Sequence, residues 1–336
     1  MNINDIGEFG FIRRIMDRYK QNIPEDFAGI GDDCAIISGL NNGEYAISTD
    51  MLVEGTHFVV SQIGPYALGR KSLSVNLSDL AAAGAVPCGV FLSLGIPDGT
   101  SLHFLDRFMD GFMEYSQKFS CPLLGGDTTM SKLGLVINVT VVGKRIEQRR
   151  ISRAGALPGD VICVTGVLGD SGAGLDFVLH PDRPRSEAAL QLVERHHNPY
   201  PRVEEGIYLA SMPYVHAMMD ISDGVASDLK HILSRSQVSA TIFTEKLPIS
   251  DMLRQEFGSQ PSKIVGYALN GGEDYELLLT VASAHFADLS AAFRRKFGIA
   301  LHAIGNISNN PEHKVFYVEN GANVNSIGVG WNHFTA

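Results

Sequence analysis

The sequence predicts a two-domain protein of the α/β or α+β class. Its 336 residues, 45% of them apolar, exceed what a single hydrophobic core usually organises. Segments with strand periodicity alternate with segments with helix periodicity along both halves of the chain. Charged residues make up only 19% of the chain, and 35 glycines and 14 prolines supply many turns, which excludes a coiled coil and a disordered chain.

The first half has the pattern strand, helix, strand, helix, strand. Strands are expected at 44–51, where apolar and polar residues alternate, at 88–95 and along the β-branched run 133–143, with helices at 66–83 and 102–119. The polar stretch 144–153 follows, with five lysines or arginines in ten residues, and it is the best candidate for a linker.

The second half repeats the alternation. Expected strands cover 160–166, 217–221, 240–244, 275–281, 301–307 and 314–318, and expected helices cover 171–180, 203–211, 224–234 and 284–297. The polar segment 180–201 is interpreted as a surface excursion. The pattern alone leaves open whether the two halves pack separately or share one sheet.

Charge and cysteine placement exclude several classes of function and location. The formal net charge of −10 disfavours nucleic acid as a partner, because the surface would repel a polyanion. The four cysteines are widely separated and form no C-x-x-C pair, which argues against a zinc site and fits a reducing cytoplasm. The N-terminus lacks the basic and apolar regions of a signal peptide, and the longest apolar run, 80–96, contains Pro87 and three glycines. We therefore expect a cytoplasmic protein without a membrane span.

Acidic residues recur in glycine-rich turns and at strand ends, where an unpaired carboxylate is costly. Six such segments are GIG-Asp32-Asp33, I-Ser48-Thr49-Asp50, NLS-Asp79, GG-Asp127-TT, Asp220-I-Ser222-Asp223-G and GG-Glu273-Asp274-YE. Any one of them is explained by a turn or a helix cap, in which the side chain binds nearby backbone N–H groups. Six together favour a shared site. Converging carboxylates need a cation, and oxygen ligands without His or Cys select Mg²⁺ or Mn²⁺, which usually serves a phosphate substrate.

The common nucleotide-binding motifs are missing from the chain. There is no G-x-x-x-x-G-K-[ST] loop and no G-x-G-x-x-G motif that opens a helix, so P-loop and Rossmann folds are disfavoured. The stretch 166–174, GVLGDSGAG, could dock an anion or form an ordinary turn, and Arg153 could clamp a phosphate or be a solvated charge. His57 lies beyond Asp50 and could face a substrate or be a satisfied structural residue. No arrangement of a nucleophile with a base is compelling.

The order of the motifs carries a resemblance that runs nearly end to end. The matching segments are GIGDDCA, AISTDMLVEGTHF, GRKSLSVNLSDLAAAGA, GGDTT, RAGALPGD, VTGVLGDSGAG, DISDGVASDL, GGEDYEL and GWNHF. In this order they resemble the thiamine-monophosphate kinase family, which shares a superfamily with aminoimidazole ribonucleotide synthetase, selenophosphate synthetase and a hydrogenase maturation protein. Selenophosphate synthetases carry a reactive cysteine in an N-terminal glycine loop. Cys34 follows the aspartate pair and is not part of such a loop, which counts against membership of that family.

The resemblance implies a fold and a set of site residues. Expected are an N-terminal α/β domain, 1–147, whose sheet forms a homodimer interface, a C-terminal α/β domain, 148–336, and ATP between them. The implied metal ligands are Asp33, Ser48, Thr49, Asp50, Asp79, Asp127, Asp220 and Asp223, with Asp32 a less certain neighbour. The implied nucleotide contacts are Gly126, Asp127, Arg153 and Ser222, and the implied contacts to thiamine phosphate are His57, Glu273 and Trp331. Asp50, Asp127 and Asp220 are expected to contribute most to catalysis.

The implied reaction is direct in-line transfer of a phosphoryl group from ATP to thiamine monophosphate, assisted by several Mg²⁺ ions, as the last step of thiamine diphosphate biosynthesis. A phosphate monoester has a second pKa near ~6, so the acceptor needs no general base at neutral pH. Two alternatives remain open. One is another ATP-dependent phosphoryl transfer of the superfamily, such as activation of an amide in purine synthesis, and the other is a silent nucleotide-binding regulator.

Overall fold

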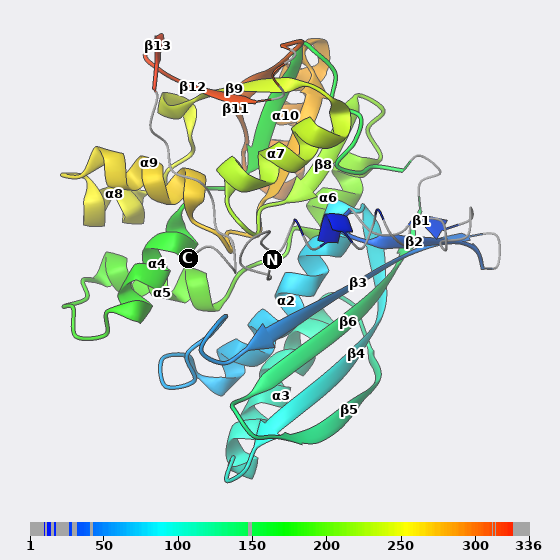
Figure 1. Ribbon diagram of the computed structural model, residues 1–336, viewed down its shortest axis with the longest axis vertical. Helices are drawn as coiled ribbons and strands as arrows, with labels where there is room; N and C mark the ends of the chain where they lie inside the picture. Colours follow the sequence, from blue (N-terminus) through cyan, green and yellow to red (C-terminus); the bar gives the residue numbers. More distant parts are fainter. Residues whose placement is uncertain are drawn as a thin grey trace.

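Two separate β-sheets, one in each half of the chain, organise the fold (Figure 1). The computed structural model describes residues 10, 12–14, 17, 27–28, 32–40, 43–146, 150–310, 312 and 314–324. The first sheet contains β1 (Phe27–Ala28), β2 (Ala35–Leu40), β3 (Gly43–Val53), β4 (Ala85–Pro97), β5 (Leu123–Ser131) and β6 (Val136–Arg145), in the order β1-β2-β3-β6-β4-β5. All neighbours in it are antiparallel except β4 and β5.

Helices α2 (Pro65–Ala82) and α3 (Leu102–Lys118) lie on one face of the first sheet. They pack closely at Gly69 and Gly111, where a Cβ atom would overlap the backbone of the other helix. No described helix covers the opposite face of the sheet, and this face exposes 54% of Met51 and 41% of Phe91. The alternation along each strand therefore separates a face buried under α2 from an open face.

The second sheet has seven strands in the order β13-β12-β9-β11-β7-β10-β8. They are β7 (Asp160–Thr165), β8 (Val215–Asp220), β9 (Ser239–Phe243), β10 (Leu277–Ala282), β11 (Leu301–Ser308), β12 (Val315–Glu319) and β13 (Ala322–Asn323). Its helices are α4 (Asp170–Leu179), α5 (Glu187–His197), α6 (Val203–Ala210), α7 (Val225–Ser236), α8 (Asp251–Phe257), α9 (Pro261–Asn270) and α10 (Ser283–Phe297), with the short 3-10 helix η2 (Thr244–Lys246). Helices α4, α5, α8 and α9 form a group to one side of the sheet (Figure 1).

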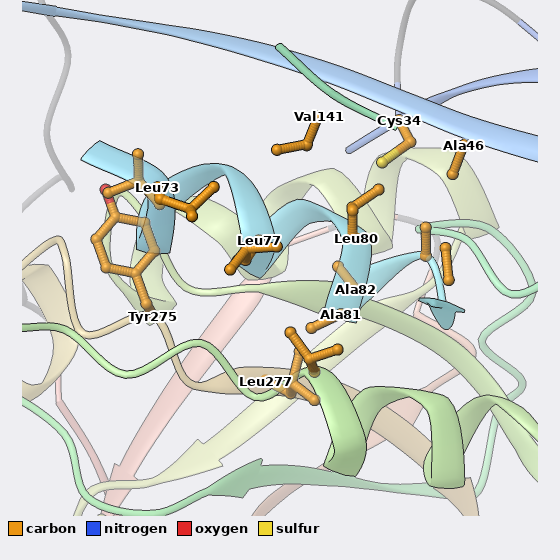
Figure 2. Close-up of a cluster of buried hydrophobic side chains, with 14 of the residues drawn as sticks. Cys34, Ala46, Leu73, Leu77, Leu80, Ala81, Ala82, Val141, Tyr275 and Leu277 are labelled. Carbon is orange, nitrogen blue, oxygen red and sulfur yellow. The ribbon is translucent and has the colours of Figure 1, made fainter. Parts of the chain in front are cut away.

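Helix α2 is buried between the two halves and joins their cores. Figure 2 shows Leu77 and Leu80 of this helix between Val141 of the first sheet and Leu277 of the second. All four belong to one continuous cluster of buried apolar side chains. The two halves thus have separate sheets but share a core, and whatever projects from α2 is held rigidly between them.

Most elements lie where the periodicity predicts them, and the exceptions have physical reasons. The surface excursion expected at 180–201 is wrong, because α5 occupies much of it. Ala189, Leu192 and His196 of α5 follow helical spacing and are buried, and a Cβ on Gly174 of α4 would overlap the carbonyl of Leu192. The first two residues of the linker expected at 144–153 belong to β6, and Arg145 there forms a 2.6 Å ion pair with Glu44 of the neighbouring strand β3. Among the described residues, no helix is both long and apolar enough to cross a lipid bilayer.

Candidate active site

Four aspartates from four separate segments meet beside α2, and we call them the acidic cluster: Asp33, Asp50, Asp79 and Asp220. Asp33 precedes β2, Asp50 lies in β3, Asp79 in α2 and Asp220 at the end of β8. One carboxylate oxygen each from Asp33, Asp79 and Asp220 lies within 4.8 Å of the other two. The structure therefore brings together aspartates from four of the six acidic segments of the sequence.

The backbone explains why Asp50 joins this cluster. Along β3, Ala46 and Leu52 are buried beneath α2, and Asp50 shares their face because side chains alternate along a strand. The backbone N–H of Asp50 donates to the side-chain oxygen of Asn76 in α2, at 3.1 Å. Strand and helix are thus fixed relative to each other at the point where their carboxylates converge.

Burial and like charges raise the pKa values of Asp50, Asp79 and Asp220. Burial, followed by the charge of Asp33, raises the pKa of Asp220 to about 8 and that of Asp50 to about 6. Burial, followed by the charges of Asp50 and Asp220, raises the pKa of Asp79 well above its usual range. Each carboxylate opposes the ionisation of the others, and this arrangement is relieved by a cation.

Two serines next to the cluster donate hydrogen bonds into it, whereas Thr49 turns away. The hydroxyl of Ser48 donates to Asp79, and that of Ser78 donates to Asp220 at 2.7 Å. The Thr49 side chain lies on the open face of the sheet and donates to the carbonyl of Val139 at 3.1 Å. The Thr49 side chain therefore points away from the cluster, which lies on the other face of β3.

Arg153 is partly buried against the edge of the acidic cluster. Its guanidinium donates to Asp33 from two nitrogens, at 2.6 and 3.2 Å, and its backbone N–H donates to Asp32 at 3.3 Å. These neighbours raise the pKa of Arg153 despite its burial, which lowers it. Burial and the charge of Asp33 raise the pKa of Asp32 to about 6. The structure therefore places Arg153 as a fixed positive charge at the edge of the cluster.

Ser222 and Asp223 lie in the loop that follows β8, directly after Asp220. Both line the same cavity as the acidic cluster. The backbone N–H of Asp223 donates to Asp228 at 3.2 Å, and the carbonyl of Ser222 accepts from the N–H of Glu273 at 2.8 Å. The loop is thus fixed at both ends of the Ser222-Asp223 pair.

Gly126 and Asp127 are not brought to the cluster within this chain. Across the sheet, Asp127 of β5 lies opposite Ser93 of β4, Ser93 opposite Asn138 of β6, and Asn138 opposite Met51 of β3. The backbone of Asp127 is therefore three strand spacings, about 14 Å, from the backbone of Met51. Its side chain lies on the open face of the sheet, opposite Asp50. Gly126 has no room for a side chain, since a Cβ would overlap the carbonyl of Leu92.

A cavity of about 630 Å³ opens from the acidic cluster between the two halves. The cluster members Asp50, Asp79 and Asp220 line one part of it. Val59, Leu175, Val178 and Tyr267 line another part and belong to the apolar core of the α4, α5, α8 and α9 group. One cavity therefore combines a strongly acidic region with an apolar wall.

Two of the three residues expected to contact substrate line this cavity, and the third lies outside the described residues. His57 follows β3, and its Nδ1 accepts from the backbone N–H of Val53 at 3.0 Å. Glu273 lies in the loop between α9 and β10 and forms a 3.0 Å ion pair with Lys71 of α2. Trp331 is not among the residues that the structure describes.

The glycine-rich stretch 166–174 does not offer a free anion site. The backbone N–H groups of Gly169 and Ser171, at the start of α4, donate to the carboxylate of Asp274 at 2.7 and 3.2 Å. The hypothesis that a phosphate docks on these N–H groups is therefore wrong, because a carboxylate of the same chain already fills the position.

Sequence reasoning missed Lys71 and His196, which also line the cavity. A signal for Lys71 was present, since it lies in an expected helix whose following residues, 72–78, are all uncharged. His196 had no comparable signal, because the segment that contains it was not expected to be a helix.

Comparison with known proteins gives consistent matches over both halves. Residues 31–145 match the family model described as AIR synthase related protein, N-terminal domain, and residues 158–318 match the corresponding C-terminal domain. The thiamine-monophosphate kinase of Buchnera aphidicola subsp. Acyrthosiphon pisum is 40% identical over 303 residues, 90% of this chain and 91% of the relative. The enzyme of the same name from Escherichia coli K12 is 37% identical over 329 residues, 98% of each chain.

A solved structure described as AaThiL complexed with AMPPCP and TMP has a TM-score of 0.83 and 32% sequence identity, and the match covers 99% of each chain. The two-domain α/β fold and the family resemblance expected from the sequence are confirmed by these matches.

Proposed function

Because this chain belongs to the AIR synthase related protein family across both of its halves, we propose that it transfers the γ-phosphoryl group of ATP to thiamine monophosphate, yielding ADP and thiamine diphosphate. Relatives named thiamine-monophosphate kinase match nearly the whole chain, and the structural relative holds AMPPCP, an ATP analogue, together with TMP. We place this reaction in the cytoplasm.

The observation that carries the proposal is the composition of the cavity. Its acidic region, with Asp50, Asp79 and Asp220, suits phosphates only when cations lie between the two sets of negative charge. Its apolar wall, with Leu175 and Tyr267, suits the aromatic rings of thiamine. A substrate with rings at one end and a phosphate at the other fits both parts at once.

The residues of the acidic cluster fit magnesium. Three carboxylate oxygens within 4.8 Å of one another are hard ligands, and the raised pKa values of Asp79 and Asp220 show that the guanidinium of Arg153 beside them does not balance their charge. We propose that the metal ligands are Asp33, Ser48, the main chain of Thr49, Asp50, Asp79, Asp220 and Asp223, joined by Asp127 of a second protomer. Bound Mg²⁺ supplies the positive charge that screens the phosphates from each other.

The chain's own residues then contribute position rather than proton transfer. The acceptor phosphate has a second pKa near ~6 and is already a nucleophile at neutral pH, so no side chain has to remove a proton. The nucleotide is proposed to contact Arg153, which Asp33 holds in place, together with Ser222 and Gly126. The acceptor is proposed to contact His57 and Glu273. Positioning and neutralisation of charge are sufficient for in-line phosphoryl transfer.

A homodimer explains the position of Asp127. Within one chain Asp127 is on the open sheet face, which also exposes 54% of Met51 and 41% of Phe91. An apolar face of this kind is typical of an interface. We propose that two chains pack through this face and that Asp127 of each serves the site of the other.

Mixed dimers test this arrangement. Asp50→Asn and Asp127→Asn should each inactivate a homodimer. If Asp127 serves the other protomer, a mixed dimer keeps one intact site, and random mixing restores about a quarter of the wild-type rate. If both aspartates act within one chain, the mixture stays inactive, and the shared site between protomers is rejected.

The function itself is tested by coupled ADP release with ATP, Mg²⁺ and thiamine monophosphate, beside controls with thiamine and without acceptor. The expected result is ADP release that depends on the monophosphate and matches thiamine diphosphate measured directly. Nucleotide binding without product would reject the kinase and favour a purine-type synthetase or a silent regulator. Equal ADP release with thiamine would reject the proposed acceptor.

A further inference from the structure

Lys71 places a fully buried positive charge beside the cavity. Its side chain is 0% exposed, and its Nζ atom lies 3.0 Å from Oε2 of Glu273 and 3.5 Å from Nε2 of His196. An ammonium group is costly to bury unless it is paired. Lys71 comes from α2 and Glu273 from the loop before β10, so the pair joins the two halves of the chain.

His196 completes the arrangement around the same carboxylate. Its Nδ1 lies 3.2 Å from Oε2 of Glu273 and 3.0 Å from the hydroxyl of Ser171. Burial, followed by the charge of Lys71, lowers the pKa of His196 well below its usual value, so the ring is neutral. With Nε2 accepting from Lys71, the proton lies on Nδ1, whose hydrogen-bond partner is the hydroxyl of Ser171. Glu273 therefore receives a hydrogen bond from Lys71 of α2 and lies against the ring of His196 of α5.

The backbone also holds Glu273 in an unusual conformation. Its φ angle is +63°, in the left-handed region that non-glycine residues rarely adopt. Its N–H donates to the carbonyl of Ser222 at 2.8 Å, and a Cβ on the preceding Gly272 would lie only 2.5 Å from that same carbonyl oxygen. The next residue, Asp274, is fixed to the start of α4. Such over-determined strain is typical of functional sites.

The position of Lys71 relative to the acidic cluster indicates which part of the substrate is involved. Lys71 and Asp79 are eight residues apart on α2, about 12 Å along the helix axis. Both line the cavity, and Glu273 lines it with 22% of its side chain exposed. A phosphate held near Asp79 therefore leaves the far end of an extended acceptor near Glu273.

We propose that Lys71 and His196 are positioning residues that hold the Glu273 carboxylate as the hydrogen-bond acceptor for the aminopyrimidine end of thiamine monophosphate. This inference rests on the proposed function. The amino group of an aminopyrimidine is a donor, and a carboxylate that accepts from Lys71 and packs against His196 keeps lone pairs free on its exposed side. Lys71 itself acts through Glu273 and does not touch the reacting phosphates.

A double-mutant cycle tests the role of Lys71. The variants are Lys71→Met, Glu273→Gln and their combination, measured by KM for thiamine monophosphate, KM for ATP, kcat and thermal unfolding. Each single variant should raise KM for thiamine monophosphate about tenfold, the loss of one charged hydrogen bond, while KM for ATP changes little. Because both act through one carboxylate, the double variant should bind no worse than Glu273→Gln alone.

The matched control is Lys118→Met, which removes an exposed lysine from α3 and should leave both KM values unchanged. If the double variant raises KM for thiamine monophosphate by the product of the two single effects, Lys71 contacts the substrate directly. If Lys71→Met lowers the unfolding temperature without changing KM, the role of Lys71 is structural. Either outcome overturns the inference. If Lys71→Met does not fold, His196→Leu replaces it in the cycle with the same expectation. Failure of the wild-type protein to consume thiamine monophosphate rejects the proposed function itself, which separates the two cases.

Discussion

Two groups of buried carboxylates lie near the junction of the two halves, and their charges are balanced differently. Glu276 accepts two hydrogen bonds from the guanidinium of Arg202, at 2.5 and 2.7 Å, and one from the hydroxyl of Thr165 at 2.6 Å. In the acidic cluster, by contrast, Arg153 pairs with Asp33, while Asp79 receives a hydroxyl hydrogen bond from Ser48 and lies among other carboxylates.

This difference separates carboxylates whose charge is balanced within the fold from carboxylates that we propose bind a cation. A buried acid matched by a bidentate arginine has its charge compensated in the folded chain itself. Burial, followed by the charge of Asp33, raises the pKa values of Asp50 and Asp220 instead, so the chain compensates the charge of these carboxylates only in part. Natural proteins retain such repulsion where function requires it.

The largest expected effect follows from removing one charge of the acidic cluster. Asp50→Asn should lower kcat about 10³-fold, because it weakens neutralisation of the phosphates at nearly constant volume. It should leave the unfolding temperature unchanged or raise it, since one repelling charge is gone. Steady-state kinetics and thermal unfolding measure both, with Asp98→Asn at an exposed position as the control. Near-normal turnover at saturating Mg²⁺ would remove Asp50 from the metal site.

The matched carboxylate should behave in the opposite way. Glu276→Gln leaves the guanidinium of Arg202 without its main counter-charge in a buried site, which should destabilise the protein by about 3 kcal/mol. Denaturant unfolding measures this loss, and kcat at a temperature well below unfolding should change far less than in Asp50→Asn. Glu312→Gln, which breaks an exposed ion pair with Lys314, serves as the control and should cost about 0.5 kcal/mol or less. A drop in kcat as large as that of Asp50→Asn would erase the distinction between the two groups.

Magnesium should sharpen the same comparison without any change in protein sequence. If the acidic cluster binds Mg²⁺, the ion should stabilise the wild-type protein by about 2–3 kcal/mol at one hundred times its dissociation constant. Asp79→Asn should lose most of this stabilisation, whereas Glu276→Gln should keep it. Unfolding curves recorded with Mg²⁺ and with a chelator give the free energy of unfolding in the two conditions for each variant. Equal stabilisation in Asp79→Asn and the wild type would place the ion elsewhere.

Much of the fold could be predicted from the sequence, because periodicity reports local burial. Most elements lie within a few residues of their expected bounds, as α2 (Pro65–Ala82) does for the helix expected at 66–83. Strand β5 (Leu123–Ser131) was missed, since its residues are nearly all exposed and carry no alternation in this chain. Helix α5 (Glu187–His197) was missed because prolines and polar residues before and after it suggested a loop.

The candidate site was predictable only where the sequence pattern reports chemistry directly. Acidic residues in glycine-rich turns indicated Asp33 and Asp220, which the structure brings together. Lys71 and His196 could not be identified in the same way, because their role depends on contacts between residues 125 positions apart. The separation of Asp127 from Asp50 within one chain likewise depends on strand order, which periodicity does not report.

The smallest expected effect concerns His197 of α5, which lines the cavity. Burial, followed by the charges of Lys71 and Arg185, lowers the pKa of His197 from 6.5 to about 4. Between these values the unfolded chain binds more protons than the folded one, so stability falls as the pH drops. Between pH ~7 and pH ~5.5, protonation linked to this histidine should lower the free energy of unfolding by about 1 kcal/mol. The variant His197→Gln should abolish this loss. The control His103→Gln, at an exposed position of α3, should retain it. Unfolding curves at both values measure it, and an equal pH dependence in His197→Gln would show that the loss arises from other groups.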